Sequence, residues 1–143
     1  VTAIKPRASF PIHMIIEEAH RYIKSDNDIE IIGYNIFDRI TKEGRKYGII
    51  LGLITQRPSE LSTTSISQCS NFIVLKLYYP DDLELIKKIT ANISENMINK
   101  VKTLRPGMAL CFGNAFKVPL VASLGLPDPM PESTSVNLVD TWF

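Results

Sequence analysis

The sequence predicts an α/β protein in which a mainly parallel β-sheet carries helices on its faces and a β-hairpin lies near the C-terminus. Strand-like and helix-like segments alternate along the chain, which is the order that a parallel sheet requires. Apolar residues also occur in short unbroken runs, as they do in strands that are buried on both faces. The chain has 143 residues, of which 45% are hydrophobic and 22% are charged, so it is large enough to bury the core of one domain.

The first half of the chain predicts two strands with a helix between them. Residues 1–11 contain two prolines and are expected to form a connecting segment. The apolar runs 12–16 and 47–54 predict the two buried strands. Apolar side chains recur at spacings of three and four over residues 29–40, which indicates a helix that Gly44 can end.

The next part of the chain predicts a third strand and further helices. A short helical segment within residues 59–67 precedes a strand-like run at residues 71–77. Pro80 and the two acids after it favour a helix start, because proline and carboxylates stabilise the first turn. Ser94 can cap a further helix that ends near residue 104, since its hydroxyl can accept a bond from a free backbone N–H. Residues 12–104 therefore predict the sheet and its helices.

The C-terminal part predicts a hairpin and a tail. Within residues 105–126, the runs 108–112 and 116–123 flank Gly113 and Asn114, a pair that favours a turn between antiparallel strands. Residues 127–143 begin with closely spaced prolines and are expected to be extended.

Polar residues follow two of the predicted parallel strands. Glu17 and Glu18 come directly after the first strand, and Thr55, Gln56 and Arg57 come after the second. Ligands of open α/β sheets lie beyond the carboxyl ends of the strands. Adjacent acids there can hold a metal-bound water and polarise an attacking water, although the same pair is also common in the first turn of a helix.

Three further side chains each allow two interpretations. Gln56 can orient water beside a γ-phosphate, or it can bond to nearby backbone. Arg45 follows the end of the predicted helix, where its guanidinium can reach the nucleotide of a neighbouring subunit or complement the helix dipole. Arg57 precedes a proline and can be held rigidly, or it can be solvated.

The histidines and cysteines predict no metal site. His13 and His20 lack the spacing of the helical zinc motif, and we expect His20 to contact the acids or a neighbouring strand end. Cys69 and Cys111 have no partners at metal-ligand spacing, so we expect reduced structural thiols in a cytoplasmic protein. The longest apolar runs are strand-sized, which argues against a membrane span.

A phosphate-binding loop is absent from the sequence. The pattern GxxxxGK followed by Ser or Thr does not occur, and the 7 glycines are scattered. The chain also lacks an initiating Met and a signal-peptide pattern, so we expect it to be a fragment. Because it has no phosphate-binding loop, we expect this fragment to bind ATP weakly, if at all, by itself. The formal net charge is +1, and no global basic field indicates nucleic-acid binding.

Taken in order, three segments resemble the HerA-like family of hexameric DNA translocases, which belongs with the FtsK-like motors in the RecA-type P-loop fold. These segments are IHMIIEEAHRYI, EGRKYGIILGLITQRPSEL, and QCSNFIVLKL followed by PDD. The resemblance covers about residues 10–131. It implies that residues 1–143 are the C-terminal portion of a RecA-like ATPase domain with a partial, mainly parallel sheet, and that the preceding half supplies the Walker A lysine.

The resemblance also implies a role for five residues. Glu17 would be the Walker B acid that holds Mg²⁺ through water, although many relatives have aspartate at this position. Glu18 would be the catalytic glutamate, Gln56 the sensor glutamine and Arg45 the arginine finger that acts on a neighbouring subunit. Arg57 would be a second contact to the nucleotide.

For the complete protein, the resemblance implies a DNA translocase or helicase that binds ATP and Mg²⁺ between the subunits of a ring, expected to be a hexamer. DNA would pass through the central channel, towards which Lys24 and residues 25–28 would lie. A nuclease such as NurA or another effector would be a partner, and no membrane would be involved. Two alternatives stay open: a conjugation or secretion-type ATPase of the same superfamily, and a non-catalytic interaction module.

Overall fold

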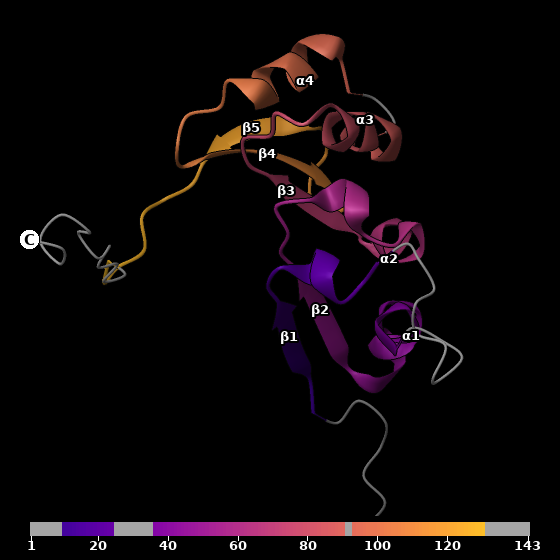
Figure 1. The fold of residues 1–143 in the computed structure, drawn as a ribbon. Coiled ribbons are helices and arrows are strands. Elements are labelled where there is room, and N and C mark those ends of the chain that lie inside the picture. Colours follow the sequence, from indigo (N-terminus) through magenta and orange to yellow (C-terminus); the bar gives the residue numbers. More distant parts are fainter. Residues whose placement is uncertain (1–9, 25–35, 91–92, 131–143) are drawn as a thin grey trace, which may run out of the picture.

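The computed structural model describes residues 10–24, 36–90 and 93–130, and it shows a mixed α/β fold (Figure 1). In these residues, one sheet is a parallel pair of strands and the other is an antiparallel sheet of three strands. The α/β class is confirmed. The expectation of a mainly parallel sheet is not met in the described part of the chain, because the third strand pairs with the hairpin and not with the second strand.

The parallel pair places two strand ends next to each other. β1 (Ile12–Ile16) pairs in parallel with β2 (Ile49–Leu53). Backbone bonds continue beyond both strands: the N–H of Ile54 donates to the carbonyl of Ile16, and the N–H of Ala19 donates to the carbonyl of Ile54, each at 2.9 Å. The residues that follow β1 are therefore held beside those that follow β2.

A helix and a tight turn connect these two strands. α1 (Ile36–Glu43) is followed by the 3-10 helix η2 (Gly44–Tyr47). Gly44 is buried, and a Cβ atom there would lie 3.3 Å from the Cβ of Ile49, so glycine allows the chain to pass close to β2. The helix predicted from residue 29 is confirmed over α1, and residues 29–35 lie outside the described residues.

The second sheet contains the predicted hairpin. β3 (Asn71–Val74) pairs antiparallel with β4 (Met108–Gly113), which pairs antiparallel with β5 (Leu120–Ser123). β5 begins later than predicted, because residues 114–119 form a longer connection than a two-residue turn. The described end of the chain, residues 124–130, contains no helix or strand.

Three helices follow the sequence signals closely. α2 (Thr63–Gln68) lies before β3, while α3 (Pro80–Ile89) and α4 (Glu95–Lys102) follow it. The side chain of Ser94 accepts a hydrogen bond from the N–H of Met97 at 3.3 Å, which is the predicted cap. Among the described helices, none has the length and apolar character that crossing a membrane requires.

Two apolar clusters form the core, and α3 contributes to both. α3 and α4 cover one face of the three-stranded sheet (Figure 1). The buried residues of this first cluster are Val74, Leu83, Ile86, Ile98, Val101, Leu110 and Phe112. The second cluster packs against the last residues of β1 and β2, and its buried members are Ala19, Ile23, Leu61 and Ile66. Leu85 and Ile89 of α3 pack against this second cluster, so the helix joins the two halves of the fold.

Candidate functional site

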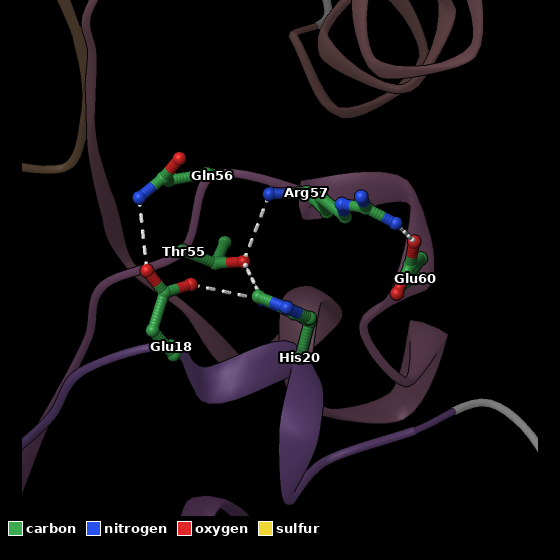
Figure 2. Close-up of polar contacts among 6 residues, drawn as sticks. All are labelled: Glu18, His20, Thr55, Gln56, Arg57 and Glu60. Atoms are coloured by element: carbon green, nitrogen blue, oxygen red, sulfur yellow. Dashed lines mark hydrogen bonds and ion pairs between the residues drawn. The ribbon is translucent and has the colours of Figure 1, made fainter.

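Polar side chains beyond the ends of β1 and β2 form one cluster (Figure 2). The amide nitrogen Nε2 of Gln56 donates a hydrogen bond to Oε1 of Glu18 at 2.9 Å. Nδ1 of His20 lies 2.9 Å from Oγ1 of Thr55 and 3.4 Å from Oε2 of Glu18. The structure thus brings Glu18 and Gln56 together, and the expectation that His20 contacts the acids or a neighbouring strand end is confirmed.

The backbone of Glu18 explains how its carboxylate reaches this cluster. Glu18 has φ 48° and ψ 43°, which is the left-handed conformation, and it is the one non-glycine residue with positive φ among the described residues. This conformation costs about 1–2 kcal/mol for a residue with a Cβ atom. It turns the chain sharply between β1 and the 3-10 helix η1 (Ala19–Arg21), whose first residue is fully buried. Backbone strain is thus located at a proposed catalytic acid.

Nδ1 of His20 has two polar neighbours, Oγ1 of Thr55 and Oε2 of Glu18, and its role as donor or acceptor towards Thr55 depends on the tautomer. A carboxylate only accepts hydrogen bonds, so Nδ1 interacts favourably with Glu18 only when it carries a hydrogen. Oγ1 of Thr55 also accepts the backbone N–H of Arg57 at 3.0 Å. His20, whose side chain is 15% exposed, therefore ties the end of β1 to the end of β2.

The carboxylate of Glu18 is held from two sides and still reaches solvent. Its side chain is 41% exposed, and each carboxylate oxygen keeps a further acceptor position beside the hydrogen bond from Gln56 or the ion-pair contact with His20. Since the amide nitrogen of Gln56 faces Glu18, its amide oxygen points away from the carboxylate (Figure 2). This arrangement can accept a proton from water at Glu18 and offer a second polar group at Gln56.

Arg57 is engaged with a residue of its own loop. Its guanidinium donates to Oε1 of Glu60 at 2.8 Å, across the 3-10 helix η3 (Pro58–Glu60), and points away from Glu18 (Figure 2). This hydrogen bond lowers the pKa of the Glu60 carboxyl and raises the pKa of Arg57. The structure therefore places Arg57 near the cluster without bringing its guanidinium to Glu18.

Glu17 and Arg45 lie outside this set of contacts. Glu17 is exposed, and it makes no side-chain hydrogen bond or ion pair with the described residues. Arg45 is exposed in η2, before β2 begins, so it lies at the opposite end of the strand from Gln56. The 5 residues of β2 span about 16 Å, and the chain does not bring Arg45 to Glu18 by itself.

The roles of two residues in this region were not predicted from the sequence. Thr55 was counted among the polar residues after the second strand but was given no contact of its own, although it is the first polar residue after β2 and lies next to Gln56. Glu60 was given no role, although its spacing of three from Arg57 suits a contact across one turn. Both patterns are local, and neither gives the direction in which a side chain points.

Comparison with known proteins finds helicases over most of the chain. A probable helicase of Methanocaldococcus jannaschii is 36% identical over 132 residues, which are 92% of this chain and 25% of that protein. The DNA double-strand break repair helicase HerA of Sulfolobus acidocaldarius is 31% identical over 133 residues, 93% of this chain and 26% of that protein. The chain thus spans about a quarter of the length of the curated relatives it matches.

A viral ATPase is similar in structure. The genome packaging NTPase B204 from Sulfolobus turreted icosahedral virus 2, solved in complex with ATP-γS, superposes with a TM-score of 0.62 at 26% identity. The match covers 80% of this chain and 52% of the viral protein. A scan of the sequence against models of known protein families finds no match.

Proposed function

Given that this chain is a relative of the HerA-like helicases, we propose that it is the C-terminal portion of the motor domain of a ring-forming, ATP-dependent DNA translocase. The similarity to a DNA double-strand break repair helicase and to a genome packaging NTPase supports a motor that acts on DNA. The single observation that carries the proposal is the hydrogen bond between Gln56 and Glu18. It joins the ends of two parallel strands, where α/β folds bind ligands.

The geometry supports Glu18 as the general base. Its half-exposed carboxylate takes the proton of a water while the water oxygen bonds to the γ-phosphorus and the bond to the ADP oxygen breaks. Gln56 holds Glu18 with one amide hydrogen and has a second hydrogen for a γ-phosphate oxygen. On the other side of the carboxylate, Nδ1 of His20 lies 3.4 Å from Oε2 of Glu18. Loss of the γ-phosphate would therefore remove a hydrogen-bond partner of Gln56 and could shift the Glu18 carboxylate to which Gln56 is bonded.

Glu17 is the proposed residue for Mg²⁺ binding through water. The described residues contain no group of three or more ligating side chains that could hold a metal. A single exposed carboxylate nevertheless fits Mg²⁺, which keeps several waters and is bound by one or two carboxylates together with phosphate oxygens. The ion would neutralise charge on the phosphates of bound ATP.

The parallel pair is proposed to belong to a larger RecA-like sheet. Ile15 of β1 is 68% exposed and Ile50 of β2 is 55% exposed, whereas parallel sheets in proteins are covered on both faces. Strands and helices of the preceding half of the polypeptide, including the phosphate-binding loop, would cover these side chains. This part of the proposal is also supported by the viral ATPase, of which the chain matches only 52%.

Arg45 is proposed to act on the nucleotide of a neighbouring subunit in a ring, expected to be a hexamer. Its position at the far end of β2 is suited to an interface between subunits and not to the Glu18 site of its own chain. Arg57 is proposed as a second nucleotide contact that exchanges Glu60 for a phosphate oxygen. We also propose that the complete protein is cytoplasmic and works with a nuclease or another effector protein.

The proposal is tested by ATP binding and steady-state hydrolysis of the complete protein with and without double-stranded DNA. Glu18→Gln keeps the size of the side chain but removes the base. We expect ATP affinity to stay within about threefold while turnover falls at least about a hundredfold. Glu84→Gln, an exposed acid on α3, is the matched control and should behave as the wild type.

Three results would contradict parts of this assignment. Unchanged hydrolysis by Glu18→Gln would remove Glu18 from the base role. Hydrolysis by the wild type that DNA does not stimulate would favour a conjugation or secretion-type ATPase, and a wild type with no hydrolysis would favour a non-catalytic interaction module.

A further inference from the structure

A buried carboxylate lies behind the loop that carries Gln56. Asp82 is the third residue of α3 and is 4% exposed, which makes it the one buried acid among the described residues. Its Oδ1 atom accepts a hydrogen bond from the backbone N–H of Ser59 at 2.9 Å. An acid is rarely buried to this extent without a partner, so this bond accounts for its position.

The bond fixes the far end of the loop formed by residues 55–60. At its near end, the loop is held by Gln56 on Glu18. At Ser59 the loop is attached to α3, a helix that contributes no residue to the Glu18 cluster. After the loop, the chain is held again where Leu61 is buried in the second cluster and the N–H of Ser62 donates to the carbonyl of Ile23. The bond to Asp82 therefore fixes the part of the loop between Gln56 and Leu61.

α3 is a rigid support for that attachment. Leu83 and Ile86 are buried in the cluster between the three-stranded sheet and the helices α3 and α4, while Leu85 and Ile89 pack against the second cluster. The position of the carboxylate in the first turn is favoured by the helix dipole. The pKa of the Arg57 guanidinium is raised chiefly by its hydrogen bond to Glu60, and the negative charge of Asp82 raises it further.

We propose that Asp82 is a positioning residue for ATP hydrolysis: it anchors the backbone of the loop that presents Gln56 to Glu18. This inference rests on the proposed function and extends it to a residue that touches neither nucleotide nor water. A displacement of about 1 Å at a reacting group can cost up to about a hundredfold in rate, so a distant anchor can control turnover.

The test measures kcat and KM for ATP in the complete protein with DNA present. Asp82→Ala removes the acceptor, and we expect kcat to fall at least about tenfold while KM changes less than about twofold. Asp82→Asn keeps an acceptor oxygen of the same reach and should restore kcat to within about threefold of the wild type. Asp81→Asn, the exposed neighbour, is the matched control and should be silent.

A double-mutant cycle separates positioning from a merely structural role. If Asp82 acts through the loop, Asp82→Ala should lower kcat less than about twofold when Gln56→Ala is already present. The proposal would be overturned if Asp82→Ala lowered kcat by the same factor in the wild type and in Gln56→Ala. It would also be overturned if Asp82→Ala lowered thermal stability but left kcat, measured per ATP-binding site, unchanged. If Asp82→Ala does not fold, Asp82→Ser, whose hydroxyl is too short to reach Ser59, takes its place in the same cycle.

The same assay distinguishes failure of the proposed function from failure of the positioning role of Asp82. Full activity in Glu18→Gln would defeat the proposed function itself, whatever Asp82 does. Loss of activity in Glu18→Gln, together with full activity in both Asp82→Ala and Asp82→Ser, would defeat only the positioning role.

Discussion

At the scale of single residues, the site depends on a backbone conformation as much as on side chains. Glu18 adopts a left-handed conformation that glycine accepts freely and that other residues adopt at a cost. This turn directs the carboxylate towards Gln56 and His20 (Figure 2). Strain at such a position is retained when a side chain is needed there, which agrees with the catalytic role proposed for Glu18.

Substitutions at Glu18 can measure this strain. Glu18→Gly and Glu18→Ala both remove the side-chain contacts, so the difference between them reports the backbone alone. We expect the glycine variant to be the more stable by about 1 kcal/mol, which reverses the usual preference for alanine. Thermal unfolding of the two complete proteins is the measurement. An alanine variant as stable as the glycine variant would show that the backbone at residue 18 is unstrained.

The pair of Arg57 and Glu60 predicts a titration behaviour. The hydrogen bond from Arg57 holds the pKa of Glu60 below its ordinary value of 4.5. A carboxyl with a lowered folded-state pKa stabilises the fold above its unfolded pKa and loses this contribution as the pH falls through the lowered value. The pair is therefore fully formed at neutral pH. NMR titration of the Glu60 carboxyl should give a pKa below 4.5, which returns towards 4.5 in Arg57→Gln.

The same titration has a clear negative outcome. If the pKa of Glu60 is the same in the wild type and in Arg57→Gln, the hydrogen bond does not persist in solution. Arg57 would then be available to a nucleotide without first leaving Glu60.

Part of the site was predictable at the residue scale. Glu18 and Gln56 each follow an apolar strand, and the carboxyl ends of parallel strands lie at one edge of a sheet, so their proximity could be inferred. The contact between His20 and Thr55 and the bond between Arg57 and Glu60 depend on how the chain turns after each strand. No periodic pattern encodes such turns.

At the scale of the elements, the hairpin sheet depends on one glycine. Gly113 ends β4 with φ 120°, and a Cβ atom there would lie only 2.3 Å from the carbonyl oxygen of Ser70. The obstacle is backbone at the start of β3, and it cannot rotate away as a side chain would. Gly113 therefore permits the close approach of β3 and β4.

Gly113→Ala should consequently destabilise the complete protein by more than about 2 kcal/mol. Gly125→Ala is the matched control: a Cβ atom there meets nothing within 4 Å, and we expect a change within about 0.5 kcal/mol. Chemical denaturation of both variants is the measurement. Equal stability of the two would mean that β3 and β4 can separate at this point without cost.

Helices were more predictable than strand partners. Pro80 and Ser94 stand at helix starts as expected, because caps act within a few residues. The run at residues 71–77 predicted a strand but not its neighbour, and the structure pairs β3 with β4. The choice of partner depends on contacts between distant segments, which the local pattern does not contain.

At the scale of the whole molecule, the proposed ATP site lies between two subunits of a ring. Glu18 and Gln56 would come from one chain, and Arg45, at the other end of β2, is proposed to reach the site of a neighbour. A ring with head-to-tail contacts repeats this arrangement at every interface.

Two inactive variants should therefore restore each other. Arg45→Ala subunits keep Glu18, and Glu18→Gln subunits keep Arg45, so a mixed ring contains interfaces with both groups intact. For equal random mixing in a head-to-tail ring, we expect ATP hydrolysis of about a quarter of the wild-type rate. Mixing Arg45→Ala with itself is the control. Mixed rings without any recovery would show that Arg45 does not act across the interface.

The α/β class was predictable for the whole molecule because strand and helix segments alternate along the chain. The division into two sheets was not predictable, since β3 pairs with β4 and not with β2, and within the described residues the first sheet is a pair of strands. α3 joins the halves through side chains in both clusters, a role that its amphipathic pattern alone does not reveal.

The central claim is that Glu18 and Gln56 face one triphosphate. The most direct test is a structure of the complete protein with Mg²⁺ and a non-hydrolysable ATP analogue. We expect the γ-phosphate to lie beyond the ends of β1 and β2, with the Gln56 amide within hydrogen-bond distance and Glu18 facing the attacking water. A γ-phosphate bound at the opposite end of these strands, beyond reach of both side chains, would contradict it.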